Sequence, residues 1–379
     1  MLIGIVGKPN VGKSTFFKAA TLAEVLIANY PFATIKPNQG VGYVKVKCVD
    51  VDFNTQCNPR TGFCINHTRF VPVQLLDVAG LVPGAHEGKG LGNQFLDDLR
   101  QADAFIHVID GSGKTDAEGK PTDNYDPVKD IIFLEEELDY WFFGLMEKAW
   151  RGFTRKAKAD KMPLHEAIVK QFSGLKINEG QVKQAIFDTG LNPENAEAWN
   201  SDNLLKFSKA LRKISKPMII AVNKSDTKEG KNNYNKLKRE FSQHVIVPCS
   251  ADSELALREA AKAGLIDYIP GERTFTIKKD LNDRQKAALE IIKKNVLDAF
   301  DEGTGVQAVL NYAVFKLLNY IAVFPAGASK LADRNGNILP DCFLLPSGST
   351  ALDLAYTCLL YTSDAADDLL CVDLGGRRI

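Results

Sequence analysis

Short runs of consecutive apolar residues recur along the chain, and each has the length of a buried β-strand. Stretches with helical periodicity separate most of them. An alternation of buried strands and helices predicts a parallel-rich, three-layer α/β domain whose ligand loops lie at the carboxyl ends of the strands. The expected strands are Leu2–Val6, Tyr43–Val49, Val71–Leu76, Ala104–Asp110, Pro217–Val222 and Val245–Val247.

A long helical pattern interrupts this alternation. We expect residues 128–213 to form a helical insertion that divides the α/β domain into residues 1–127 and 214–272. Residues 273–319 are expected to form a helical connector. The basic stretch at residues 151–161 is more typical of a solvated helix face than of an RNA contact.

Composition narrows the class of protein without specifying its chemistry. Lys and Arg together number 47, as do Asp and Glu, so bulk charge favours neither nucleic acid nor a membrane surface. No apolar run is long enough to span a membrane, and because Met1 leads directly into the first strand we expect no signal sequence. Seven scattered cysteines argue against a disulfide scaffold. We expect a reduced, cytoplasmic, monomeric protein.

The segment Gly7–Ser14 reads GKPNVGKS and matches the Gly-x-x-x-x-Gly-Lys-Ser pattern of a phosphate-binding loop. A strand precedes it, and a helical stretch, Thr15–Leu26, follows. Glycines let backbone N–H groups surround a polyphosphate, and the helix N-terminus favours negative charge. The expected nucleotide contacts here are Gly7, Lys8, Pro9, Asn10, Val11, Gly12, Lys13, Ser14 and Thr15.

Two further positions are typical of a nucleotide switch. Thr34 lies in a turn-rich stretch where a hydroxyl can sense Mg²⁺ and the γ-phosphate. Asp77 ends a predicted strand, and the N–H of Gly80 can sense the γ-phosphate. We expect Mg²⁺ to be held by Ser14, Thr34 and Asp77, the last through water. The expected catalytic groups are Lys13, Thr34 and Gly80.

A second motif, Asn223-Lys224-Ser225-Asp226, follows another predicted strand. Guanine presents N1–H and its exocyclic amine as neighbouring donors, and the Asp226 carboxylate can accept both. Adenine presents the opposite pattern and would leave that carboxylate unpaired. We expect Asn223 to tie the loop together, the Lys224 stem to cover the base, and a backbone N–H at Ser250 or Ala251 to reach the guanine oxygen.

The stretch from Cys48 to Phe70 looks irregular and contains Cys57, Cys64 and His67. Zinc binding is one interpretation, but the ligand spacings do not match the usual paired patterns. We therefore favour a surface loop with incidental cysteines.

These motifs, in this order, resemble those of translation-factor-class GTPases. The combination of Asn29–Phe32, Asp77–Ala85 and Gly88–Gly92 is similar to the Obg/YchF group, specifically its archaeal and eukaryotic members with a C-terminal TGS domain. The resemblance covers Met1 to about Thr357. It implies a P-loop GTPase that binds GTP and GDP and works with ribosomes or RNA.

The resemblance also carries expectations about chemistry. Members of the YchF branch that prefer ATP depart from Asn-Lys-x-Asp, which this sequence keeps, so GTP is favoured. Leu81 stands where many GTPases place the glutamine that orients water, so hydrolysis should be slow unless assisted. Asn10 matches the asparagine of K⁺-stimulated GTPases, so K⁺ is a hypothetical second cofactor beside Mg²⁺.

At the C-terminus, residues 320–357 resemble the start of a TGS domain, a small β-grasp module. Phe343–Thr350 followed by Ala351–Tyr356 fits its strand-turn-helix opening. Residues 358–379 do not continue the module, and we expect a non-native tail there. The module would then be truncated and its opening strands would lack partners, so protease should trim the chain from about Lys330 onward.

Two other functions remain open on the sequence. One is an ATPase of the same fold, which tight binding of ATP would favour. The other is an RNA- or ribosome-binding adaptor that holds a nucleotide without significant turnover. The presence of Lys13, Ser14, Thr34 and Asp77 together argues against the adaptor.

Overall fold

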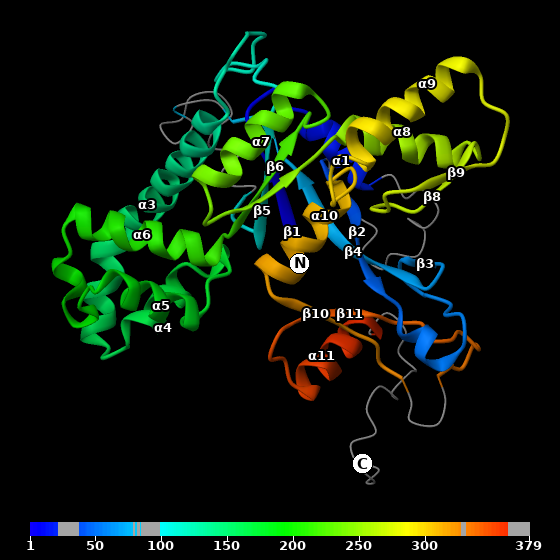
Figure 1. Ribbon diagram of the computed structural model, residues 1–379. Helices are drawn as coiled ribbons and strands as arrows, with labels where there is room; N and C mark the ends of the chain where they lie inside the picture. Colours follow the sequence, from blue (N-terminus) through cyan, green and yellow to red (C-terminus); the bar gives the residue numbers. More distant parts are fainter. Residues whose placement is uncertain (22–37, 79, 82–83, 85–98, 327–330, 363–379) are drawn as a thin grey trace.

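The computed structural model describes residues 1–21, 38–78, 80–81, 84, 99–326 and 331–362. Within them, strands and helices alternate along the first half and again after the helical region (Figure 1). The strands are β1 (Leu2–Val6), β2 (Gln39–Lys47), β3 (Phe63–Ile65), β4 (Thr68–Asp77), β5 (Ala104–Asp110), β6 (Met218–Asn223), β7 (Val245–Pro248), β8 (Ile266–Tyr268), β9 (Phe275–Ile277), β10 (Tyr320–Val323) and β11 (Phe343–Pro346).

The α-helices of the described residues include four consecutive ones between residues 128 and 215. The helices are α1 (Lys13–Thr21), α3 (Val128–Ala159), α4 (Leu164–Gln171), α5 (Glu179–Thr189), α6 (Ser201–Ser215), α7 (Lys228–Glu240), α8 (Ala251–Lys262), α9 (Asp283–Ile292), α10 (Val306–Asn311) and α11 (Ala351–Thr362). Short 3-10 helices at Val49–Phe53, Ser173–Leu175 and Pro193–Ala198, and π-helical turns at Lys293–Leu297 and Tyr312–Leu317, join some of them.

The central sheet has the strand order β2-β4-β1-β5-β6-β7, with β3 attached to β4. Strands β4, β1, β5, β6 and β7 are parallel, and β2 and β3 run antiparallel to β4. Every residue of β1, β5 and β6 is buried. Helices cover both faces of these strands, which explains why their sequences are continuous apolar runs rather than alternating ones.

Two separate apolar cores lie on the two faces of the sheet. On one face α1, α8 and α10 pack through residues such as Phe16, Ala251 and Leu310. On the other, the apolar stripes of α3 and α6 pack through residues such as Leu138 and Phe207. This is the three-layer α/β architecture that the sequence predicts.

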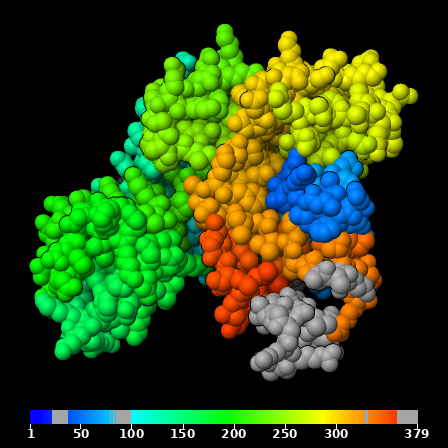
Figure 2. All heavy atoms as spheres, turned by 60° about the horizontal axis from the view of Figure 1, so that its bottom comes forward, coloured from blue at the N-terminus to red at the C-terminus, as the bar shows by residue number. Residues whose placement is uncertain are grey.

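Helices α3 to α6 form a lobe at one side of the molecule (teal to green in Figures 1 and 2). Its core contains an aromatic cluster in which Trp150 and Trp199 stack with ring centroids 5.2 Å apart. A buried pair, Arg212 and Asp139, joins α6 to α3 at 2.6 Å. The basic residues 151–161 lie at the end of α3, where most of their side chains are exposed.

Two expectations about the strands need correction. The strand expected at Tyr43–Val49 runs instead from Gln39 to Lys47, because β2 pairs with β4 along that whole length and Val49 begins a 3-10 helix. The stretch from Cys48 to Phe70 is not irregular throughout. It contains a 3-10 helix and the β3–β4 hairpin, whose two-residue turn has Asn66 and His67 at φ 47° and 60°. Positive φ at both positions suits a tight two-residue hairpin turn. Such a turn usually contains glycine, and because this one does not, nothing in the sequence indicated it.

The C-terminal strands also differ from expectation, because β10 and β11 pair with each other. The predicted lack of strand partners is therefore wrong. Residues 331–346 are also held by the segment that precedes the β3–β4 hairpin, because the N–H groups of Asn58 and Arg60 donate to the carbonyls of Ile338 and Pro340. The predicted strand-turn-helix sequence is present, with β11 followed by α11. Of the expected non-native tail, residues 363–379 lie outside the described residues.

Candidate nucleotide-binding site

The loop Gly7–Ser14 connects β1 to α1, so it lies at the carboxyl end of a parallel strand and at a helix N-terminus. Gly12 has a φ of 95°, and a Cβ there would lie 2.2 Å from Nδ2 of Asn223. Only glycine lets the two loops approach this closely. The Lys13 ammonium donates to the carbonyl of Lys8 at 2.8 Å, which places it over the turn of the loop.

Lys13, Ser14 and Asp77 come together at the end of β4 and the start of α1. Burial lowers the pKa of Lys13 to about 8, although attraction to Asp77 opposes the shift. Burial likewise raises the pKa of Asp77, with the Ser14 hydroxyl and Lys13 acting in the opposite direction. A hydroxyl and a carboxylate are hard oxygen ligands of the kind that Mg²⁺ prefers, so this donor set fits the ion.

Gly80 and Leu81 continue from Asp77 beside the phosphate loop. A Cβ at Gly80 would lie 2.8 Å from the backbone nitrogen of Pro9, so glycine is required for this contact. The N–H of Leu81 donates to the carbonyl of Gly7 at 3.1 Å, and its side chain is buried in the core. Thr34 and the motifs Asn29–Phe32 and Gly88–Gly92 lie outside the described residues.

Asn223 connects its own loop to the loops that contain Val11 and Ala251, whereas the sequence predicted only that it ties its own loop together. Its Nδ2 donates to the carbonyl of Val11 at 2.9 Å, and its Oδ1 accepts from the N–H of Ala251 at 3.0 Å. The Ala251 N–H therefore already has a partner, and a guanine oxygen would have to share it. The N–H of Ser250 is also engaged, by the carbonyl of Thr304 at 2.9 Å.

Asp226 lies beside this bridge and is half-buried. The Ser250 hydroxyl donates to Asp226 Oδ1 at 2.9 Å, which orients the carboxylate. The Lys224 ammonium forms an ion pair with Asp110 at 2.9 Å. Asp110 also accepts hydrogen bonds from Ser112 and Thr115, and together with Lys224 these lower its pKa against the effect of burial.

Sequence reasoning missed a set of contacts around Lys8. Its ammonium is buried, lies 2.9 Å from the carboxylate of Asp130 and sits 3.8 Å from the centre of the Tyr125 ring. Burial raises the pKa of Asp130, and Lys8 opposes that shift. Asp130 lies in the first turn of α3, so Lys8 joins the phosphate loop to the helical region. An acidic residue in a first helical turn is too common a signal to have revealed this pairing.

Asn10 is positioned by the same segment. It has a φ of 63°, a left-handed conformation that asparagine tolerates, and its Nδ2 donates to the carbonyl of Gly119 at 2.9 Å. The side-chain oxygen is thus the atom with which Asn10 could ligate a cation.

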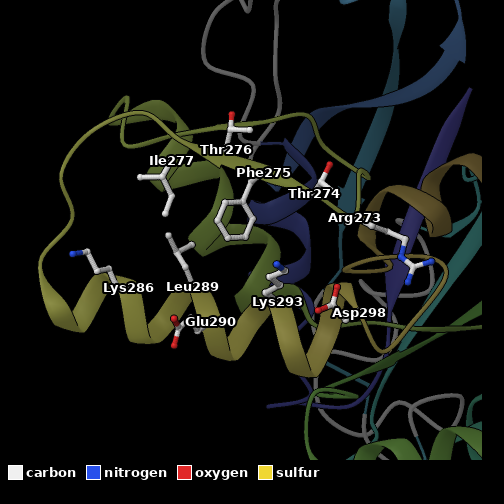
Figure 3. A pocket seen from close by; sticks show the side chains of 10 residues that line it. All are labelled: Arg273, Thr274, Phe275, Thr276, Ile277, Lys286, Leu289, Glu290, Lys293 and Asp298. Atoms are coloured by element: carbon white, nitrogen blue, oxygen red, sulfur yellow. The ribbon is translucent and has the colours of Figure 1, made fainter.

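A surface pocket lies elsewhere, between β9 and α9 (Figure 3). Phe275 and Ile277 project from β9 towards Leu289 of α9, with Lys293 at the rim. None of the residues that line this pocket is one of the expected nucleotide ligands. It is therefore separate from the phosphate loop.

The cysteines of the 48–70 stretch are not the incidental surface residues that we favoured. Cys48 and Cys57 are buried, and Cys64 is half-buried. They lie together because the β3–β4 hairpin folds back on the 3-10 helix, an effect of tertiary structure that the ligand spacing does not reveal.

No helix in the described part of the chain is both long and apolar enough to cross a membrane. Two family models match the sequence. Residues 2–137 match a 50S ribosome-binding GTPase model, and residues 221–327 match the G4 motif-containing domain of YGR210-like Obg-like GTPases.

Relatives extend the match to most of the chain. An uncharacterized GTP-binding protein of Methanocaldococcus jannaschii is 49% identical over 356 residues, covering 94% of this chain and 89% of the relative. The ribosome-binding ATPase YchF of Haemophilus influenzae is 33% identical, covering 70% and 69%. The crystal structure of a GTP-binding protein from Pyrococcus horikoshii aligns with a TM-score of 0.75 at 41% identity, covering 94% and 89%. The chain thus belongs to the Obg-like/YchF family of GTPases.

Proposed function

We propose that this protein binds GTP with Mg²⁺ and hydrolyses it slowly to GDP and phosphate, as a molecular switch. The observation that carries the proposal is the Asn223 bridge between Val11 and Ala251. It holds a base-recognition loop directly against a phosphate loop. A nucleotide could then be bound at both ends by one rigid unit, and Asp226 would face the base edge.

In this proposal the phosphates are bound by the backbone N–H groups of Gly7–Thr15 and by the ammonium of Lys13. Ser14 and Asp77 hold Mg²⁺, Asp77 through water, and Thr34 completes the metal shell. Gly80 contacts the γ-phosphate through its N–H. A charged Lys13 stabilises negative charge on the phosphates as the bond to the leaving group breaks.

The slow rate follows from Leu81. Its side chain is buried in the apolar core and carries no group that could orient a water molecule. Faster hydrolysis would then need assistance from a partner, or from the positive charge of K⁺ bound at Oδ1 of Asn10. Comparing GTP turnover in K⁺ and Na⁺ buffers tests the second route, and equal rates would exclude it.

Guanine selectivity is the sharpest test, because several relatives are named ATPases. Competition of unlabelled GTP and ATP against a fluorescent guanine nucleotide measures it. We expect GTP to bind more tightly, and Asp226→Asn to weaken GTP by roughly 10- to 100-fold, since a charged acceptor is lost. Asp267→Asn, which changes an exposed acid on β8, is the matched control. Equal affinity for ATP would support the ATPase function instead.

We further propose that the partner is the ribosome, with the helical region at residues 128–213 and a partial TGS module at residues 320–357 reading out the nucleotide state. The YchF relative named ribosome-binding supports the partner. Lys8 supports the coupling, because it joins the phosphate loop to α3. Measuring GTP turnover with and without ribosomes tests the proposal. Ribosome binding without any turnover would favour the adaptor alternative.

A further inference from the structure

Three cysteines and one aspartate form a compact cluster beneath the β3–β4 hairpin, away from the nucleotide loops. One ligand atom from each of Cys48, Asp50, Cys57 and Cys64 lies within 4.8 Å of all the others. Asp50 is fully buried, Cys48 and Cys57 are almost so, and Cys64 is half-buried. The proposed nucleotide chemistry uses none of them.

Two separations within the cluster lie close to the edges of a metal-centred tetrahedron, and the others do not exceed 4.8 Å. The sulfur atoms of Cys48 and Cys57 are 3.5 Å apart, and the Cys64 sulfur lies 3.9 Å from Oδ2 of Asp50. Zinc–sulfur bonds of about 2.3 Å and zinc–oxygen bonds of about 2.0 Å give tetrahedral edges of about 3.5 to 3.8 Å. The four atoms are thus spaced to bind one ion without large rearrangement.

Groups around the cluster are placed to support such an ion. His67 Nδ1 lies 3.0 Å from Oδ1 of Asp50, and Oδ2 accepts from the backbone N–H of Cys57 at 3.0 Å, so both oxygens of the carboxylate are held in place, with Oδ2 on the side of the sulfurs. Arg69 is fully buried and its Nη1 lies 3.5 Å from the Cys57 sulfur. A guanidinium there offsets the negative charge of three thiolates and a carboxylate, as outer-shell partners do at metal sites.

The geometry points to a structural zinc site formed by Cys48, Asp50, Cys57 and Cys64. Three thiolates favour a soft or borderline ion, and a carboxylate as the fourth ligand favours Zn²⁺ over an all-sulfur Cu(I) or iron–sulfur centre. The four protein ligands leave no open position, which is the arrangement of structural rather than catalytic zinc.

The site would fix the contact between the β3–β4 hairpin and residues 331–346. Arg69 also donates to the carbonyls of Leu339 and Pro340, at 3.2 and 2.7 Å. Leu339 packs in the same small apolar cluster as Cys48 and Cys57. A bound ion would therefore help to hold the segment that precedes β11 against β4 through one buried arginine (orange beside blue in Figure 2).

The test is the metal content of the full-length chain purified under reducing conditions. Elemental analysis should find about one zinc per chain, and Cys57→Ser should lose most of it. Cys342→Ser is the matched control, because Cys342 is also buried but is outside the four-atom cluster. It should keep its zinc.

A second measurement does not depend on the folding of a variant. Replacing zinc by Co²⁺ in the wild-type chain should give the thiolate charge-transfer and visible absorption bands of tetrahedral cobalt.

Variants then test the individual ligands. Cys64→His, which keeps a good ligand, should retain the ion with shifted bands, whereas Cys64→Ser should weaken them. His67→Phe should lower zinc affinity by about 10- to 100-fold through the lost support of Asp50.

Three results would overturn the proposal. If the purified chain contains no metal and all seven of its cysteines react as free thiols, the cluster is only a packed group of thiols. Two missing thiols would indicate a disulfide between Cys48 and Cys57. Retention of zinc by Cys57→Ser would place the ion elsewhere.

Discussion

The ammonium of Lys8 lies 2.9 Å from the carboxylate of Asp130, and both groups are buried. The Lys8 ammonium also donates to the carbonyl of Thr115 at 2.8 Å. A residue of the phosphate loop is thus anchored in the first turn of α3, although the two residues are 122 positions apart in the sequence. Any shift of the loop on nucleotide binding would act directly on the helical lobe.

Breaking this pair should be costly. Asp130→Ala leaves the Lys8 ammonium buried without its counter-charge, and we expect the free energy of unfolding to fall by about 3–5 kcal/mol. The double variant Lys8→Met/Asp130→Leu removes both charges and should recover most of the loss. Urea unfolding measures each value. Lys158→Met, at the exposed pair with Glu197, is the control and should cost less than about 1 kcal/mol. A similar effect for both pairs would contradict the buried ion pair.

Removing the Asn223 bridge should weaken nucleotide binding and stability together. Asn223→Ala leaves the Val11 carbonyl and the Ala251 N–H without their partners, at a cost of about 2 kcal/mol or more. We expect nucleotide affinity to fall by at least about 10-fold, because the phosphate and base loops lose their fixed spacing.

The control for this variant is Asn200→Ala, which removes the N-cap of α6. It should lower stability by about 1 kcal/mol but leave affinity unchanged. Calorimetric titration with GTP and GDP measures affinity, and urea unfolding measures stability. Equal loss of affinity in both variants would mean that stability alone governs binding.

His107 should make the fold sensitive to acid. It is fully buried on β5, and burial together with the positive charges of His244, Lys13 and Lys8 lowers its pKa to about 3. Below its ordinary pKa of about 6.5 the unfolded chain binds a proton that the folded chain does not. The free energy of unfolding should therefore fall as pH drops from about 6.5 towards 3, by up to about 1.4 kcal/mol per pH unit.

His107→Leu removes that proton from both states, so its stability should decline less steeply with acid. Urea unfolding of both proteins at intervals between pH 7 and pH 4 gives the two slopes. Other titrating groups are common to both chains and cancel in the difference. Parallel slopes would show that His107 does not contribute to acid lability.

Limited proteolysis should spare residues 331–346. The sequence led us to expect trimming from about Lys330, but Arg69, Asn58 and Arg60 all bond to that segment and β11 pairs with β10. Cleavage should instead fall after Pro346, since α11 exposes Leu352 and Tyr356. Intact-mass measurement of the resistant fragment locates its end. A fragment that stops before Leu331 would restore the original expectation.

The sequence alone determined the fold class, and it located the loops that we propose as the nucleotide-binding loops. Continuous apolar runs such as Leu2–Val6 and Ala104–Asp110 matched β1 and β5 residue for residue, because strands covered on both faces carry no polar alternation. The phosphate loop was equally readable, since its glycines and Lys13 follow one another locally. Asn223 could be assigned a linking role because its motif follows a strand.

Tertiary structure decided what local pattern does not encode. The Lys8–Asp130 pair and the contact of Asn10 with Gly119 join positions more than a hundred residues apart, and neither has a spacing signature. Cys48, Cys57 and Cys64 looked incidental because their spacing is unusual. A hairpin turn at Asn66 and His67, made without glycine, is what folds them into one cluster with Asp50. Long-range contacts depend on how elements pack, so only the folded chain could show them.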